Sequence, residues 1–191
     1  MKNNKVWSFL KPIIVLTVIA AVMAALLGGT NLLTKDKIRK IEEKNQLEAI
    51  KKVIKADNYI LSEIEFEGTS YDYYKATNSE NMVLGYVFSL SSNGYGGAVK
   101  SVVGIDKNGE ILAVEILDVS NETPGLGQNA TRSSFTDQFK NHSEPVEVNK
   151  SATKENEIQA VTGATITSKA VANSVNLALE LFATIGKAGG K

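Results

Sequence analysis

The longest uninterrupted apolar stretch of the chain lies close to its N-terminus. Residues 12–34 carry no charged side chain and are mostly Ile, Val, Leu, Ala and Met. A helix needs about 20 consecutive apolar residues to cross the hydrocarbon core of a bilayer. The pattern therefore predicts a transmembrane helix over residues 12–34, with Pro12 at its start, where a missing N–H breaks no hydrogen bond. A cleaved signal peptide is the alternative, but its apolar core would be shorter.

Basic residues flank this span on both sides and do not by themselves choose its orientation. Three lysines precede it, and four Lys or Arg residues follow closely. A short basic tail normally stays in the cytoplasm, and a large domain behind a first span is translocated largely regardless of its charge. We therefore expect a single-pass protein of the bacterial cell membrane, with residues 1–11 as a short cytoplasmic tail and the C-terminal domain on the extracytoplasmic side.

After residue 34 the hydrophobic period is that of an amphipathic helix. Apolar residues recur at helical spacing among Lys and Glu; they are Ile38, Ile41, Leu47, Ile50, Val53 and Ile54. The pattern predicts a stalk helix over residues 35–56, which continues or restarts the membrane helix and docks on a domain formed by residues 57–191. A simple linker helix explains the same pattern.

From residue 57 onward the period changes to that of β-strands. The predicted strands cover residues 60–66, 71–76, 82–90, 99–105 and 111–119. The last two are joined through Asn108-Gly109, a pair suited to positive φ angles. A polar stretch rich in Thr and Ser follows over residues 122–154, and helical spacing of apolar residues predicts a final helix over residues 166–185. The expected fold class is α+β, with an antiparallel sheet flanked by helices behind the N-terminal transmembrane helix.

Composition excludes several classes of function. The 21 Lys and Arg residues balance the 21 Asp and Glu residues, so the chain lacks the general basic field of a nucleic-acid-binding protein. Without cysteine it forms no disulfide, no thiolate-ligated iron–sulfur cluster and no thiol nucleophile. The chain has one histidine, His142, so it cannot build a multi-histidine metal site or a Ser-His-Asp triad in the usual way. We expect no catalytic residue and no metal ligands, and an exported hydrolase has no support.

Two loops are unusually rich in glycine. The first, residues 93–97, has three glycines between two predicted strands, which lets the backbone turn sharply or pass close to another group. From these residues alone a plain turn is the better explanation of this loop. The second, residues 122–127, contains Pro124-Gly125, a turn in which Pro fixes φ and Gly accepts a positive φ. Leu126 follows and is a candidate to cover a flat ligand or to plug the core.

The segment of residues 162–167, Thr-Gly-Ala-Thr-Ile-Thr, immediately precedes the final helix. A helix start presents unpaired N–H groups and a partial positive charge, which stabilise a phosphate. The alternative is that Thr162 or Thr165 simply caps the helix, and from these residues alone capping is the better explanation. No phosphate-binding loop of the nucleotide-hydrolase type is present, because Lys169 comes too late.

The threonine segment, together with the loop of residues 122–127, resembles a known family of FMN-binding domains. These domains occur in the G subunit of the Rnf ion-translocating electron-transport complex and in the C subunit of the sodium-pumping NADH:quinone oxidoreductase. The resemblance covers nearly the whole chain, since the anchor, the glycine loop, the second loop and the threonine motif follow in the family's order. The family commonly has an aspartate six residues before the modified threonine, where this chain has Gln159. The compact length is more similar to the Rnf subunit.

The resemblance implies a covalent flavin and assigns residues to it. A flavin transferase that uses FAD would esterify the FMN phosphate to Thr165. The remaining expected cofactor-binding residues are Thr162, Gly163 and Ala164 of the motif, Thr123 and Leu126 near the ring, and Gly96 of the glycine loop. The chain would then be an electron-carrier subunit, working with other membrane subunits, rather than a self-sufficient enzyme.

Three alternatives stay open at this point. The chain could be the C-type subunit of a sodium-pumping NADH:quinone oxidoreductase, or a free-standing flavinylated domain that delivers electrons to an extracellular acceptor. In a different class, it could be a membrane-tethered binding or sensor domain, with Thr165 only a helix cap. That last alternative predicts a colourless protein.

Overall fold

The computed structural model describes residues 3–188, and the side chains of residues 7–187. The chain divides into two units, one ending at Lys44 and the other beginning at Asn45. The first helix, α1 (Asn3–Val53), contributes to both units, and each unit is described by itself.

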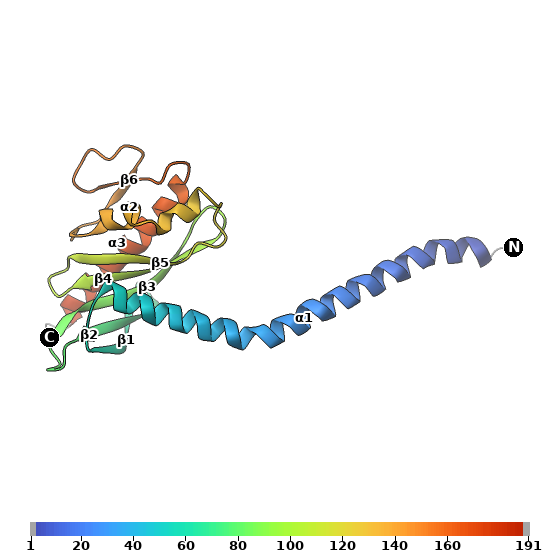
Figure 1. Ribbon diagram of the computed structural model, residues 1–191, viewed down its shortest axis with the longest axis horizontal. Helices are drawn as coiled ribbons and strands as arrows, with labels where there is room; N and C mark the ends of the chain where they lie inside the picture. Colours follow the sequence, from blue (N-terminus) through green and yellow to red (C-terminus); the bar gives the residue numbers. More distant parts are fainter. Residues whose placement is uncertain (1–2, 189–191) are drawn as a thin grey trace. The chain divides into compact units, whose positions relative to one another are not determined.

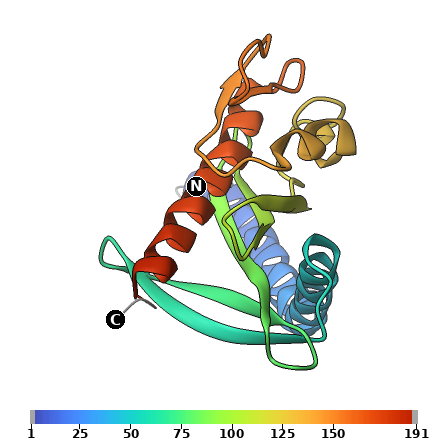
Figure 2. The same cartoon turned by 90° about the vertical axis from the view of Figure 1, so that its left-hand side faces the viewer.

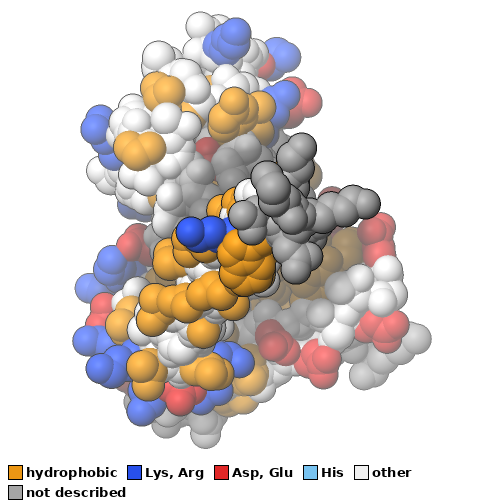
Figure 3. Space-filling view, turned by 90° about the vertical axis from the view of Figure 1, so that its right-hand side faces the viewer, with side chains coloured by type: hydrophobic (Ala, Val, Ile, Leu, Met, Phe, Trp, Pro, Cys, Tyr) orange, Lys and Arg blue, Asp and Glu red, His pale blue; other side chains and the backbone are white. Residues whose placement is uncertain are grey.

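The first unit is the apolar part of α1 (Figure 1). An 18-residue window of this helix has a mean hydropathy of 2.5, long and apolar enough to cross a membrane, and its hydrophobic side chains lie exposed on the helix surface (Figure 3). Pro12 lies inside the helix, so its predicted place at the helix start is wrong. The hydroxyls of Thr17, Thr30 and Thr34 each donate to the carbonyl four residues earlier. These bonds satisfy the three threonine hydroxyls within the helix itself, as an apolar solvent requires.

The second unit is built on a five-stranded antiparallel sheet with the order β1-β2-β3-β4-β5. The strands are β1 (Asn58–Phe66), β2 (Thr69–Thr77), β3 (Val83–Asn93), β4 (Ala98–Asp106) and β5 (Ile111–Asp118). Each strand pairs with its neighbour in sequence, which needs only short connections. All five predicted strands are therefore confirmed, within three residues at each end.

Two hairpin turns use positive φ angles in different ways. Between β1 and β2, Glu67 and Gly68 have φ of 50° and 74°, as in the two-residue turns that match the twist of paired strands. Between β4 and β5, Gly109 has φ of 98°, but Asn108 does not adopt a positive φ. The backbone N–H of Asn108 instead donates to the Asp106 carboxylate at 2.8 Å, so Asp106 holds this turn with its side chain.

Helices cover both faces of the sheet, as Figure 2 shows. The C-terminal helix α3 (Thr165–Ala188) packs on one face, in a core that includes Phe88, Val103 and Leu181. The end of α1 packs on the other face through Ala49, Ile50, Val53 and Ile54. A Cβ added at Gly104 would lie 2.9 Å from the Val53 Cβ, so the glycine in β4 lets this helix end lie close to the sheet. The α+β prediction is confirmed.

The polar connection between β5 and α3 folds into short elements. They are η1 (Gly127–Thr131), α2 (Ser133–Thr136), η2 (Asp137–Phe139), β6 (Glu147–Asn149) and β7 (Glu157–Gln159). The two strands form a small parallel pair, and Phe135, Phe139 and Ile158 are buried in the main core. The side-chain amide of Asn176 in α3 bonds both the N–H and the carbonyl of Val146, at 2.9 and 3.0 Å. These two hydrogen bonds hold the connection against the final helix. None of the short elements was predicted from the sequence.

Candidate functional site

The C-terminal helix α3 begins directly after a tight turn. The Ala164 N–H donates to the Val161 carbonyl at 2.9 Å, and Gly163 between them has φ of 75°, which is the geometry of a type II turn. The Ser168 N–H donates to the Ala164 carbonyl at 3.0 Å, so Ala164 is the N-cap and Thr165 is the first helical residue. The N–H groups of the first turn have no carbonyl partner within the helix, and this end carries a partial positive charge.

Three threonines near this helix start have different surroundings. The hydroxyl of Thr167 is buried and donates to the Glu122 carboxylate at 2.6 Å. Thr162 is exposed, whereas Thr165 is half-buried, and its hydroxyl bonds no other group in the described part of the chain. Neither Thr162 nor Thr165 occupies the N-cap position, so the capping explanation that the sequence favoured is wrong. The Thr165 hydroxyl is available for other chemistry.

A second turn lies against the first. The Leu126 N–H donates to the Thr123 carbonyl at 3.1 Å, and Gly125 has φ of 77°, so Pro124-Gly125 forms the predicted type II turn. Leu126 remains 43% exposed, which makes it a wall of the site and not a core plug. A Cβ added at Gly163 would lie 2.9 Å from the Leu126 Cδ2, so Gly163 is required both for its φ angle and for the close approach of the two turns.

The glycine loop between β3 and β4 passes close to the chain that follows β5. The Gly94 N–H donates to the Gly97 carbonyl at 2.7 Å. A Cβ added at Gly96 would lie 1.9 Å from the Asn121 carbonyl oxygen, a distance that no side chain tolerates. The plain turn that the sequence favoured is therefore not the whole explanation, because the loop passes close to another segment and the approaching group is backbone. Between these glycines Tyr95 projects with 73% of its surface exposed.

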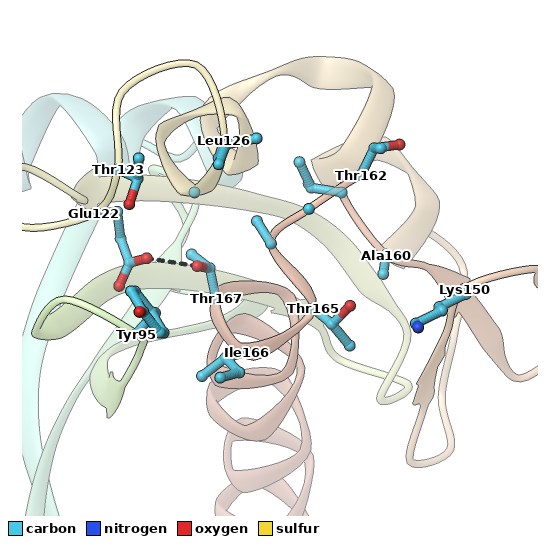
Figure 4. A pocket seen from close by; sticks show the side chains of 14 residues that line it. Tyr95, Glu122, Thr123, Leu126, Lys150, Ala160, Thr162, Thr165, Ile166 and Thr167 are labelled. Atoms are coloured by element: carbon cyan, nitrogen blue, oxygen red, sulfur yellow. Dashed lines mark hydrogen bonds between the residues drawn. The ribbon is translucent and has the colours of Figure 1, made fainter.

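These segments enclose one cavity of about 760 Å³, shown in Figure 4. The lining residues are Tyr95, Glu122, Thr123, Leu126, Gly127, Lys150 and residues 160–167. Leu126, Tyr95 and Ile166 are large apolar side chains that remain substantially exposed around it. Lys150 contributes an ammonium group on the side of the cavity where Thr165 lies (Figure 4).

The arrangement fits a ligand with a flat apolar ring system and a phosphate. The volume is within the range of about 300–1,000 Å³ typical of small-molecule sites, and exposed aromatic and aliphatic side chains offer contact area to a ring. The start of α3 and the Lys150 ammonium group both favour an anion. FMN has these two parts, and the hydroxyl of Thr165 lies where the anion-binding groups gather.

An acidic residue holds the loop that carries Lys150. Glu157 in β7 accepts hydrogen bonds from the N–H groups of Thr153 and Lys154 at 2.7 and 3.2 Å, and from the Asn149 side chain at 3.3 Å. The N–H of Thr153 is the main cause that lowers the pKa of Glu157 to about 2, because these donors stabilise the ionised carboxylate. The loop between β6 and β7 is thus ordered by a charge at neutral pH.

Comparisons with known proteins place the chain in a family. The model of the FMN-binding domain matches residues 94–180, and that of the RnfG N-terminal region matches residues 1–53. The chain is 37% identical over 193 residues to the G subunit of the Na(+)-translocating ferredoxin:NAD(+) oxidoreductase complex of Acetobacterium woodii, with 91% of both chains covered. The chain belongs to the RnfG family.

A second RnfG relative and a solved structure agree with this assignment. The G subunit of the proton-translocating ferredoxin:NAD(+) oxidoreductase complex of Clostridium ljungdahlii is 42% identical over 121 residues, 63% of each chain. The structure of the C subunit of the Na(+)-translocating NADH-quinone reductase from Parabacteroides distasonis aligns over 78% of this chain and 96% of that one, with a TM-score of 0.56 and 18% identity. The RnfG domain therefore has the fold of that reductase subunit.

Most of the residues that the sequence assigned to the flavin meet at this one cavity. Thr123, Leu126, Thr162, Gly163, Ala164 and Thr165 line it. Gly96 does not line it, but its N–H donates to the Glu122 carboxylate at 3.0 Å. Sequence analysis did not assign Tyr95, Glu122, Lys150, Ile166 or Thr167 to the site. Ile166 and Thr167 follow the threonine motif directly, and Tyr95 lies inside the glycine loop, so their positions in sequence were the available signal.

Proposed function

We propose that this chain carries one FMN, joined through a phosphoester to Thr165, and serves as an electron-carrier subunit of an Rnf-type ion-translocating complex. The observation that carries the proposal is the half-buried Thr165 hydroxyl, without a partner among the described residues, at the first position of α3 and on the wall of a cavity with apolar side chains around it. The flavin supplies the redox chemistry, and the protein binds and orients it.

The residues around the cavity have separate tasks in this proposal. The N–H groups of the first turn of α3 and the Lys150 ammonium group stabilise the charge of the phosphate. Tyr95, Leu126 and Ile166 contact the ring system and keep water from part of it. Gly163 has no side chain, and this lets Leu126 lie against the turn that precedes Thr165.

Attachment of the flavin is a phosphoryl transfer from FAD, carried out by a separate flavin transferase. The bond between the Thr165 Oγ and the phosphorus of the FMN half forms, and the pyrophosphate P–O bond of FAD breaks. AMP leaves, and the hydroxyl proton of Thr165 is lost. No electron is transferred in this step. The chain contributes the nucleophilic hydroxyl and the binding surface, whereas activation of the hydroxyl belongs to the transferase.

Flavin attachment is tested with the full chain, co-expressed with a flavin transferase and separated on a denaturing gel. The wild-type band is expected to fluoresce as flavin and to gain the mass of one FMN less one water. Thr165→Ala removes the attachment oxygen and is expected to abolish the fluorescence, whereas Thr162→Ala, a change of the exposed threonine, retains it. A dark wild-type band, or a fluorescent Thr165→Ala band, would refute the assignment.

We also propose that residues 12–34 anchor the chain in the bacterial cell membrane, with residues 1–11 in the cytoplasm and the stalk and FMN-binding domain on the other side. The chain contains no cysteine, so a single introduced cysteine is a clean probe. Ser151→Cys, at an exposed position, is expected to react with a membrane-impermeant maleimide in intact spheroplasts. Asn4→Cys, in the tail, should react only after lysis. The reverse result would contradict this orientation.

The names of two relatives support a proposal for the electron partners. Both RnfG relatives described above are subunits of ferredoxin:NAD(+) oxidoreductase complexes. We infer that this chain passes electrons between neighbouring membrane subunits of such a complex, and that coupling to ion movement resides in the whole assembly. Residues 12–34 contain no ionisable side chain, so this helix alone offers no path for an ion. Co-purification of other subunits with the tagged full chain tests the assignment.

A further inference from the structure

The wall of the flavin cavity contains a buried carboxylate to which the proposed function gives no task. Glu122 lines the cavity, yet only 3% of its surface is exposed. No Lys or Arg pairs with it among the residues that the structure describes. Burial of a charged group away from water is costly unless other groups compensate for it, so the surroundings of this carboxylate have to supply that compensation.

The two oxygens of Glu122 join segments that are far apart in sequence. Oε1 accepts a hydrogen bond from the Gly96 N–H at 3.0 Å, and Oε2 accepts one from the Thr167 hydroxyl at 2.6 Å. The second bond is drawn in Figure 4. Gly96 belongs to the glycine loop, and Thr167 belongs to the first turn of α3. One side chain thus connects the glycine loop, the loop of residues 122–127 and the helix start that carries Thr165.

Two glycines make room for this carboxylate. A Cβ added at Gly94 would lie 2.3 Å from Oε1 of Glu122, and a Cβ added at Gly127 would lie 2.5 Å from Oε2. Neither glycine has a positive φ, so the backbone does not require glycine at these positions. The space that the missing side chains leave is filled by Glu122. The absence of a side chain at these two glycines therefore leaves room for the carboxylate.

We propose that Glu122 is the positioning residue of the flavin site and that its charge tunes the bound flavin. Its carboxylate fixes the glycine loop that carries Tyr95 and the helix turn that carries Thr165, so that the ring contacts and the attachment oxygen keep their mutual geometry. A fixed negative charge in the cavity wall also opposes the addition of an electron nearby, and lowers the reduction potential of the flavin. The inference rests on the proposed attachment at Thr165.

Two substitutions separate the positioning role from the role of the charge. Glu122→Ala removes both hydrogen bonds and the charge, whereas Glu122→Gln removes the charge and one acceptor but keeps one carbonyl oxygen that can accept a hydrogen bond. Glu144→Gln is the matched control, since Glu144 is exposed and lies outside the cavity. The full-length variants are co-expressed with the flavin transferase, extracted in detergent and compared by in-gel flavin fluorescence per amount of protein.

The expected results differ for the two roles. Glu122→Ala lowers flavin loading at least tenfold, and Glu122→Gln lowers it less. The loaded Glu122→Gln protein has a more positive reduction potential than wild type by spectroelectrochemical titration, and Glu144→Gln leaves both loading and potential unchanged. Wild-type loading in Glu122→Ala, or a potential in Glu122→Gln equal to that of wild type, would overturn the inference. A merely structural role does not move the potential.

A double-mutant cycle tests whether Gly94 and Glu122 act through the same contact. Gly94→Ala introduces a methyl group where Oε1 lies and displaces the carboxylate, so it lowers loading in the wild-type background. In the Glu122→Ala background the contact with Oε1 at 2.3 Å is absent and the contact with the Val99 Cγ2 at 2.8 Å remains, so the same methyl causes a smaller further loss. Strong non-additivity supports the shared mechanism, and additive losses refute it. If wild type itself gives no flavin band, or Thr165→Ala keeps one, the proposed attachment has failed instead.

Discussion

The end of α1 is expected to be part of the folded domain, and Ile50→Ala tests this most directly. Ile50 is fully buried against the sheet, together with Val53 and Ile54. Leu47 lies one turn earlier on the same helix and is 50% exposed. Leu47→Ala is therefore a matched control that removes a similar side chain from an exposed position.

The structure sets the expected magnitudes. Truncation of a buried Ile to Ala costs about 2–5 kcal/mol, because the apolar contacts are lost and a cavity remains. A surface truncation usually changes stability by no more than about 0.5 kcal/mol. Removal of the whole segment is more severe. Burial of Ile50, Val53 and Ile54 contributes about 1.5–3 kcal/mol for each side chain, which together is comparable to the total of about 5–15 kcal/mol for a typical domain.

The assay is urea unfolding of the fragment of residues 45–191, followed by far-UV circular dichroism. The single Trp, Trp7, lies outside this fragment, so tryptophan fluorescence is not available. Ile50→Ala is expected to lower the midpoint with an unchanged slope, which indicates a loss of stability and not a change of the unfolded state. A fragment of residues 57–191 is expected to lack a cooperative transition.

Two results would refute this reasoning. One is a midpoint for Ile50→Ala that falls no further than that of Leu47→Ala. The other is a fragment of residues 57–191 that unfolds at the same midpoint as the longer one. The longer fragment also keeps the hydrogen bond from the Tyr59 hydroxyl to the Ile54 carbonyl, at 2.6 Å, which anchors the entry into β1.

Two further predictions concern the walls of the site. Gly163→Ala is expected to cost about 1–2 kcal/mol, since a residue with a Cβ is strained at φ of 75°, and to lower flavin loading by displacing Leu126. Gly186→Ala is the control: Gly186 lies in α3 with open space around it, so this change should raise the urea midpoint slightly. An equal loss of stability in the two variants would contradict the argument. Acid is expected to loosen the loop that Glu157 holds. The folded-state pKa of Glu157 is lowered from 4.5 to about 2. The contribution of Glu157 to stability is therefore present above pH 4.5 and is lost as the pH falls toward 2. Between pH 5 and 2 the urea midpoint of wild type should fall further than that of Glu157→Gln, whereas parallel curves would exclude this role.

The regular elements could be predicted from the sequence because each is long enough to show its period. The five strands have 8–11 residues, and α3 has 24, so alternation and helical spacing are visible in single segments. The connection from β5 to α3 was predicted only as a polar stretch. Its helices and strands have three to five residues, which is too short for a period. Their packing depends on contacts with α3, such as the bonds of Asn176.

The site was predicted unevenly for the same reason. Thr165 and the Pro124-Gly125 turn belong to local motifs, which can be recognised from residues that are adjacent in the sequence. The importance of Glu122 depends on Gly96 and Thr167, which are 26 and 45 residues away. No local pattern reports such a contact. The glycine loop that contains Gly94 allowed a close approach, but only the structure shows that a carboxylate fills the space.

The shape of the cavity gives a physical reason for a covalent link to the flavin. Tyr95, Leu126 and Ile166 are 73%, 43% and 52% exposed, so a ring that contacts them lies near the surface and is not enclosed. Affinity from such contacts is limited, because small-molecule sites that bind tightly bury about 70–90% of the ligand. A near-surface ring is also what an electron carrier needs, since a neighbouring cofactor has to approach it. The proposed ester to Thr165 would resolve this conflict, because retention of the flavin would no longer depend on buried area and the edge of the ring would stay accessible to a neighbouring protein.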